Sequence, residues 1–282
     1  LKFIKNNEKP FYLPSKYRKY LVSKNKNWNQ SSEKNSDDYL AKYICVYLPY
    51  ILATKRRFTN NLDPIKILDF GCGWGPLAVA LKLYRDANNK ELSYLGLDIM
   101  KDSISFLKRE FQNDKNFSFH HINASDETNY VKQARLKKKT TPNSYGKEAK
   151  FSDEIDQLFN LQWSSSVFTH LSSDAAQIGL QSISKISQND CIHVNTWLIV
   201  DDMSTYGLLT KQCDRELPYD FGDFLTYSKE NPLVCTAFKI NKILEFYEKA
   251  NLEILDIERG SWRGKYFKNP ASHYQDIIIS RP

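Results

Sequence analysis

The chain has 282 residues, of which 41% are hydrophobic and 26% are charged, as in an ordinary globular protein. Its formal net charge of +7 permits an anionic partner without requiring one. No apolar run is long enough to span a membrane, and the first residues lack the apolar core of a signal peptide, so we expect a cytoplasmic protein. The five cysteines include no Cys-x-x-Cys pair, which argues against a zinc site and a disulfide framework.

The first 60 residues form a distinct segment that is rich in Lys, Asn and aromatic side chains. Between residues 37 and 58, apolar and tyrosine side chains recur at spacings of three and four, as Tyr43, Tyr47 and Tyr50 do. This periodicity predicts a helix. We therefore expect residues 1–60 to form a helical extension that packs against the main domain or covers a bound ligand as a lid.

Residues 65–81, with the sequence IKILDFGCGWGPLAVAL, contain the most informative pattern of the chain. A short apolar run typical of a buried strand ends at Asp69, and apolar residues at helical spacing follow a glycine cluster. Gly71, Gly73 and Gly75 form that cluster. Glycines permit positive φ values and close approach of a ligand, while the helix that follows directs unpaired N–H groups at it. The segment therefore predicts a strand, a ligand-binding turn and a helix.

The residues around this turn distinguish two classes of ligand. Dinucleotide-binding enzymes use G-x-G-x-x-G, but here Pro76 takes the place of the third glycine. The carboxylate of Asp69 would repel a pyrophosphate, whereas it could accept hydrogen bonds from an ammonium group. The pattern Asp-x-Gly-x-Gly-x-Gly resembles motif I of the class I S-adenosylmethionine-dependent methyltransferases. This resemblance implies S-adenosylmethionine as the cofactor, and a nicotinamide-dependent dehydrogenase is the alternative.

Two further strands are predicted to end beside the same ligand. Residues 92–98 form an apolar run that ends on Asp98, and residues 117–122 form another that is followed by Asn123 and Ala124. In parallel sheets of this kind, ligands bind outside the carboxyl ends of the strands. The resemblance implies that Asp98 binds the ribose hydroxyls. It also implies that Asn123 lies at the adenine, where methyltransferases of this class usually have an acid.

Residues 126–154 are polar, and we expect them to form a long mobile insertion. They include the densest basic run of the chain, at residues 135–139. A basic run can contact a nucleic acid or an anionic glycan, or it can lie in a solvated loop without a partner. We expect a solvated loop here.

The fourth predicted strand, at residues 158–163, brings Trp163 and Ser164 to its carboxyl end. In a methyltransferase of this class, these residues lie beside the transferred methyl group. Enzymes that methylate exocyclic base amines or glutamine amides often have Asn-Pro-Pro-Tyr at this position. Its absence here argues against such substrates.

A hydroxyl acceptor must lose its proton, and His170 is the leading candidate for the base because it follows the fourth strand. His273 and Asp202 are weaker candidates. The alternative is that His170 fixes this connection through hydrogen bonds.

A fifth strand is predicted at residues 191–200, after which residues 201–238 interrupt the alternation of strands and helices. We expect this aromatic-rich segment to form a cap over the acceptor. Its first residues, Asp201 and Asp202, could bind a divalent metal ion, as adjacent acids do in catechol-type methyltransferases. Because no third ligand is apparent, we expect a turn at the strand end and no metal.

The last elements are predicted to be a helix at residues 239–250 and strands at residues 252–258 and 273–280. Because only a loop separates these strands, they should pair as an antiparallel hairpin. Such an ending resembles the sixth and seventh strands of class I methyltransferases, and dehydrogenases lack it. The predicted fold is therefore α/β, with residues 61–282 forming a Rossmann-like seven-stranded, mostly parallel sheet that has a C-terminal antiparallel hairpin and helices on both faces.

The phrase SSVFTHL, the WLIVDD strand end and the closing GSW-x-G…YQDI also resemble a set of bacterial methyltransferases that act on small molecules or glycans. Together, these resemblances imply an S-adenosylmethionine-dependent methyltransferase that acts on an oxygen or nitrogen of a small molecule, sugar or glycan and releases S-adenosylhomocysteine. An RNA or protein methyltransferase is a second possibility, although we do not expect a nucleic-acid partner. The extension and the cap should form the acceptor pocket, with His170 and Trp163 at its floor. The resemblance implies a cofactor site formed by Asp69, Gly71, Cys72, Gly73, Gly75, Asp98, Ile99, Asn123, Ala124, Trp163 and Ser164.

Overall fold

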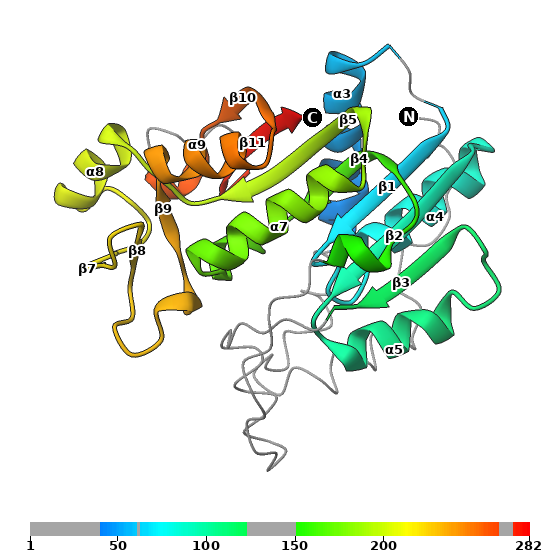
Figure 1. The fold of residues 1–282 in the computed structure, drawn as a ribbon, viewed down its shortest axis with the longest axis horizontal. Coiled ribbons are helices and arrows are strands. Elements are labelled where there is room, and N and C mark those ends of the chain that lie inside the picture. The colour runs from blue at the N-terminus through cyan, green and yellow to red at the C-terminus, as the bar shows by residue number, and fades with distance from the viewer. Residues whose placement is uncertain (1–39, 61–62, 123–150, 265–272) are drawn as a thin grey trace, which may run out of the picture.

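A seven-stranded sheet runs through the centre of the protein (Figure 1). A computed structural model describes residues 40–60, 63–122, 151–264 and 273–282. The strands of this sheet are β1 (Ile65–Phe70), β2 (Leu92–Asp98), β3 (Phe117–His121), β4 (Phe159–Ser164), β5 (Ser187–Trp197), β10 (Glu253–Glu258) and β11 (Asp276–Arg281).

The order of the strands is β10-β11-β5-β4-β1-β2-β3. Neighbours among β1 to β5 are parallel, and β11 is antiparallel to both β5 and β10. The predicted fold is therefore confirmed, including the terminal hairpin. The central strands are short apolar runs because helices cover both faces of the sheet and bury the side chains on each face. In β4, for example, all six residues are buried.

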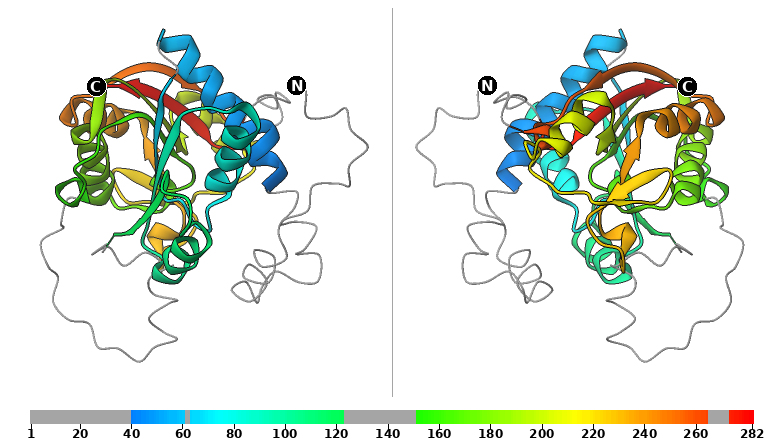
Figure 2. Two further views of the ribbon diagram at one scale, coloured as in Figure 1. Left: turned by 90° about the vertical axis from the view of Figure 1, so that its right-hand side faces the viewer. Right: turned by 90° about the vertical axis from the view of Figure 1, so that its left-hand side faces the viewer.

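Helices cover both faces of the sheet, with α3 and α7 on opposite sides (Figure 2). The helices are α3 (Leu48–Phe58), α4 (Pro76–Asn88), α5 (Lys101–Glu110), α7 (Ser173–Lys185), α8 (Asp202–Leu209) and α9 (Ile240–Lys249). Side chains of α3, α4 and α5 share an apolar cluster with Ile67, and those of α7 and α9 share another with Leu68. Successive strand residues point to opposite faces, so β1 contributes to both clusters. Within the described ranges, every helix is too short or too polar to cross a membrane.

Local signals set the helix starts. Helix α4 begins at Pro76, directly after Gly75, whose φ of 82° is in the left-handed region. Helix α7 begins after Ser172, whose Oγ accepts a hydrogen bond from the Ala175 N–H at 3.2 Å. Both signals can be read from the sequence, because a proline at the first position and a serine cap act within one helical turn.

The extension differs from the single helix predicted for residues 37–58. A turn of π-helix at Tyr43–Tyr47 precedes α3. The turn places the rings of Tyr43 and Tyr47 edge to face, with centroids 4.8 Å apart. Such π-helical turns often occur at functional sites. Residues 1–39, which make up the rest of the predicted extension or lid, lie outside the described residues.

The strand predicted at residues 191–200 is interrupted at Leu198. Strand β5 ends at Trp197, and the next residues join a second sheet with the order β6-β9-β8-β7. Its strands are β6 (Ile199–Val200), β7 (Tyr219–Asp220), β8 (Phe224–Thr226) and β9 (Ala237–Lys239). The segment at residues 201–238 thus forms α8 and most of a small sheet, which lies beyond the carboxyl end of β5 (Figure 1).

The insertion predicted at residues 126–154 is too long by at least four residues. Residues 151–154 form a turn of 3-10 helix, and the ring of Phe151 is buried against Phe70 with centroids 5.1 Å apart. The sequence analysis missed this because a single phenylalanine after a polar stretch has no periodicity. Residues 123–150, including the basic run at 135–139, lie outside the described residues.

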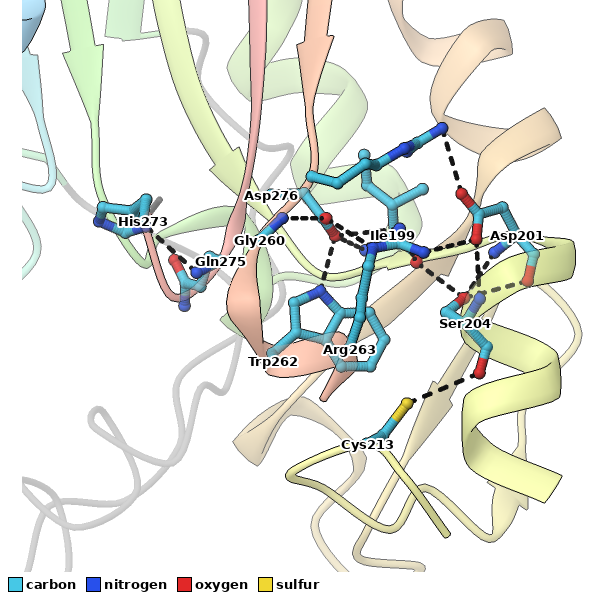
Figure 3. Close-up of polar contacts among 11 residues, drawn as sticks. Ile199, Asp201, Ser204, Cys213, Gly260, Trp262, Arg263, His273, Gln275 and Asp276 are labelled. Atoms are coloured by element: carbon cyan, nitrogen blue, oxygen red, sulfur yellow. Dashed lines mark hydrogen bonds and ion pairs between the residues drawn. The ribbon is translucent and has the colours of Figure 1, made fainter. Parts of the chain in front are cut away.

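The two sheets are joined at Asp276, a fully buried residue at the start of β11 (Figure 3). Its carboxylate accepts hydrogen bonds from the backbone N–H groups of Ile199 and Gly260, each at 2.8 Å. It also accepts from the indole N–H of Trp262 at 2.7 Å and from Nε of Arg263 at 2.9 Å. One carboxylate therefore fixes β6, the loop after β10 and the start of β11 together.

Replacing Asp276 with alanine should lower the free energy of unfolding by about 3–5 kcal/mol, because the buried Arg263 would lose one of its two carboxylate partners and three buried N–H groups would lose their acceptor. Urea denaturation measures this change. The matched control is Glu253→Ala, which removes the exposed partner of Arg281 in the same hairpin and should cost less than about 1 kcal/mol. Equal losses in the two variants would contradict the role given to Asp276.

Candidate cofactor and acceptor site

The glycine turn after β1 leaves space at one position only. Gly71, Gly73 and Gly75 have φ values of 85°, 54° and 82°, which other residues rarely adopt. A Cβ atom on Gly71 would lie 2.1 Å from Cγ2 of Val167, and one on Gly75 would lie 2.5 Å from Cδ2 of Leu107. A Cβ atom on Gly73 would meet no atom within 4 Å. Packing thus explains the outer glycines, and the central glycine faces open space where a ligand can approach.

Asp98 ends β2 directly beside this turn. Its Oδ2 accepts a hydrogen bond from the Gly73 N–H, and its Oδ1 accepts one from the Met100 N–H, each at 2.7 Å. The side chain is buried, and burial raises its pKa while these backbone bonds lower it. Each carboxylate oxygen has lone pairs for more than one hydrogen bond, so Asp98 can also accept from hydroxyl groups of a ligand.

Asp69 supplies a second buried carboxylate. Its Oδ2 accepts a hydrogen bond from the Tyr94 hydroxyl at 2.6 Å. Burial raises the pKa of Asp69 to about 7, and the negative charge of Asp98 contributes to that rise, whereas the Tyr94 bond opposes it. Cys72 lies in the turn between them, where its backbone N–H donates to the Leu97 carbonyl at 2.9 Å. Two carboxylates at one turn make a site suited to a cationic ligand.

Strand β4 ends on the two residues that the sequence analysis placed beside the transferred methyl. Trp163 is buried in the apolar cluster of α3 and α4. Because side chains alternate along a strand, Ser164 faces the opposite side of the sheet. Trp163 therefore belongs to the side that carries the extension, while the contact of Ser164 with the cofactor stays a prediction.

Tyr47 and His273 meet at Trp163, a grouping that the sequence analysis did not anticipate. The ring of His273 lies 5.1 Å from that of Tyr47 and 6.4 Å from that of Trp163, between centroids. Nδ1 of His273 accepts a hydrogen bond from the Gln275 N–H at 3.1 Å. Burial lowers the pKa of His273 to about 4, so at neutral pH the ring is uncharged and its Nε2 carries the proton. His273 is therefore a hydrogen-bond donor rather than a base.

His170 lies in a 3-10 turn, Phe168–His170, that follows β4. Its Nδ1 is 3.4 Å from the carbonyl oxygen of Leu233, which can only accept, so Nδ1 carries the proton and Nε2 the lone pair. Burial lowers the pKa of His170, which keeps the ring neutral. Thr236 fixes the same turn, because its N–H donates to the Thr169 carbonyl at 2.7 Å. The segment at residues 201–238 therefore contacts the connection predicted to hold the base.

The remaining predicted residues divide into three groups. Ile99 lies next to Asp98, and its carbonyl is 3.1 Å from Nε2 of His121. Asn123 and Ala124 lie outside the described residues. The carboxylate of Asp201 forms ion pairs with arginines 259 and 263 and caps the start of α8. Asp201 therefore has a structural role at the turn after the strand, as the sequence analysis expected. In the described part of the chain, no group of three or more His, Cys, Asp or Glu residues is placed to hold a metal ion.

Comparison with solved structures identifies the fold. An S-adenosylmethionine-dependent methyltransferase from Clostridium acetobutylicum is similar with a TM-score of 0.50 and 11% identity, over 92% of this chain and 98% of that one. DesVI of Streptomyces venezuelae has a TM-score of 0.49 and 12% identity, over 96% of this chain and 100% of that one. No protein-family model matches the chain.

The chain has the fold of the S-adenosylmethionine-dependent methyltransferases. In open α/β sheets, ligands bind outside the carboxyl ends of the strands. The glycine turn, Asp98 and Trp163 of this methyltransferase fold all lie at that edge, because they end or follow β1, β2 and β4. The fold does not by itself establish a reaction, which must be argued from the site.

We expect Asp69 to titrate near pH 7, where burial places its pKa. Tyr94→Phe should raise this pKa further because it removes a hydrogen bond to the charged form. Carbon-13 NMR of the aspartate carboxyls measures both values. A midpoint near the ordinary value of about 3.9 would contradict the assignment.

The same shift predicts how stability depends on pH. The pKa of Asp69 is higher in the folded state than in the unfolded state. Its contribution to stability is therefore complete below the unfolded pKa and is lost as the pH rises through about 7. Asp69→Asn should flatten this part of the pH profile in urea denaturation.

Proposed function

We propose that the protein is an S-adenosylmethionine-dependent methyltransferase that methylates an oxygen or nitrogen of a small molecule or glycan and releases S-adenosylhomocysteine. The observation that carries this proposal is the hydrogen bond from the Gly73 N–H to Asp98 at 2.7 Å, beside the open space above Gly73. The methyltransferase fold supports it, since the turn and the carboxylate lie at the ligand-binding edge of that fold.

The residues at this edge fit the chemistry of the cofactor. S-adenosylmethionine carries a positively charged sulfonium that donates the methyl group, an ammonium group and two ribose hydroxyls. Asp98 can accept hydrogen bonds from the hydroxyls while it holds the turn, and charge-assisted bonds of this kind are strong. Asp69, whose pKa is raised to about 7, is partly ionised at neutral pH and so adds some negative charge close to Asp98. The same charges disfavour a pyrophosphate, which is why a dinucleotide is not proposed.

His170 and Trp163 are proposed to face the acceptor. The sulfonium is a good leaving group, so much of the rate enhancement can come from positioning the acceptor oxygen or nitrogen in line with the methyl group. A hydroxyl acceptor also needs a base. A neutral His170 with its lone pair on Nε2 is suited to take that proton, and the bond from Nδ1 to Leu233 fixes this tautomer.

Asp98→Ala should weaken the binding of S-adenosylhomocysteine by about 2–4 kcal/mol, because the ligand loses a charged hydrogen-bond acceptor in a buried site. Isothermal titration calorimetry measures the affinity, and circular dichroism checks the fold. The control is Asp102→Ala, an exposed acid on the next helix, which should leave the affinity unchanged. Affinity close to that of the unaltered protein would remove Asp98 from the site.

Gly73→Val should abolish cofactor binding while the sheet stays folded, because the side chain would fill the open space that the ligand needs. Gly222→Val is a matched control. Gly222 also has a positive φ, 85°, and open space at its Cβ position, but it lies in the second sheet's turn. The two variants should lose similar stability, and only Gly73→Val should lose affinity for S-adenosylhomocysteine. Binding retained by Gly73→Val would place the cofactor elsewhere.

A further inference from the structure

Arg215 differs from the other partly buried arginines because it has no acidic partner among the residues that the structure describes. Four arginines in the described part of the chain are at least partly buried. Three of them contact a carboxylate oxygen, namely Arg85 with Asp114 at 2.7 Å, Arg259 with Asp201 at 3.1 Å and Arg263 with Asp276 at 2.9 Å. For Arg215, no carboxylate of the described residues lies within ion-pair distance.

The contacts that Arg215 makes within the described ranges include no negative charge. Its Nε donates to the hydroxyl of Tyr274 at 3.1 Å, and its Nη1 lies 3.9 Å from the sulfur of Cys235, a weak acceptor. A guanidinium has five N–H donors, so most of its donors remain for a ligand. A partly buried charge is costly unless an opposite charge or a set of hydrogen bonds compensates it. The arrangement therefore suits an anion.

Arg215 is held in position by the junction between the two sheets. The N–H of the preceding residue, Asp214, donates to the Trp262 carbonyl at 2.9 Å, and the Trp262 N–H donates to the Tyr274 carbonyl at 3.0 Å. Asp276 fixes Trp262 through the indole N–H (Figure 3). The segments that carry Arg215 and Tyr274 are thus both hydrogen-bonded to Trp262. A preorganised site of this kind loses little entropy when it binds.

The position of Arg215 places it on the acceptor side of the proposed active site. Its charge lies near enough to His170 to contribute to the lowered pKa of that ring. Tyr274 follows His273, which contacts Trp163 at the end of β4. Tyr274 is 37% exposed, and the centre of its ring lies 5.5 Å from the guanidinium carbon of Arg215, so this polar and aromatic surface is accessible from solvent.

We infer that Arg215 binds an oxyanion of the methyl acceptor, so that the acceptor is a molecule with a carboxylate or a phosphate group. This inference rests on the proposed function, because it assigns a substrate class to the same site. A guanidinium binds either group through two parallel N–H···O hydrogen bonds, which a lysine cannot reproduce. Tyr274 adds an aromatic surface beside the anion, which favours an acceptor with an aromatic or apolar body next to its charge.

The test measures the binding of benzoate, phenyl phosphate and neutral benzamide to the full chain by NMR titration at constant ionic strength. Arg215→Gln should weaken the binding of one or both anions by about tenfold to a hundredfold, as expected for lost charge-assisted hydrogen bonds, and should leave benzamide unaffected. Arg215→Lys should recover part of the loss. The control is Arg109→Gln, an exposed arginine on α5, which should change nothing.

Equal anion affinity in the unaltered protein and in Arg215→Gln would overturn the inference, as would the absence of binding by both anions. If Arg215→Gln does not fold, the test uses the Nε–H resonance of Arg215 in the unaltered protein, assigned by comparison with Arg215→Lys. This resonance should shift when an anion is added, and the absence of a shift would also overturn the inference. Binding of S-adenosylhomocysteine is measured separately and should be the same with and without Arg215. Its absence from the unaltered protein would overturn the proposed function and with it the identification of the anion as a methyl acceptor, whereas anion binding that depends on Arg215 would still be shown by the titration.

Discussion

The carboxylate of Asp98 is the interaction on which the ligand-binding edge depends, because it accepts a backbone hydrogen bond from each of two loops. Gly73 belongs to the turn after β1, and Met100 belongs to the turn after β2. The two strands are parallel and pair from Ile65 and Leu92 onward, so their carboxyl ends lie at the same level. A charged acceptor binds N–H groups more strongly than a neutral one does, and the glycine turn is therefore fixed before a ligand arrives.

The distribution of charge at this edge follows from buried carboxylates at two separate places. Asp98, with Asp69 behind it, makes the glycine turn negative. At the other side, Asp201 and Asp276 both pair with Arg263 and Asp276 also fixes Trp262, whereas Arg215 is a positive group without an acidic partner among the described residues. In our proposals, a cationic cofactor and an anionic acceptor therefore each meet the opposite charge.

Local sequence signals were sufficient wherever the structure depends on neighbouring residues. The apolar run that ends at Asp98 predicted β2 with its observed bounds. A strand that is buried on both faces is apolar along most of its length, so its own residues are enough to identify it. The serine cap of α7 at Ser172 can also be read from the sequence, because it joins residues only three positions apart. The glycine pattern also predicted a ligand-binding turn, and the open space at Gly73 agrees with it. The fold class followed from the order of these elements along the chain.

The sequence by itself thus determined the strand–turn–helix unit, the acid that ends β2 and the terminal hairpin, all of which rest on spacing within one or two elements. Only the tertiary structure decided that Tyr47, Trp163 and His273 meet, and that Arg215 has no carboxylate partner among the described residues, unlike the other partly buried arginines. It also decided that the chain leaves the main sheet at Leu198. These features depend on contacts between segments far apart in the chain, and no local pattern records which side chains such contacts bring together.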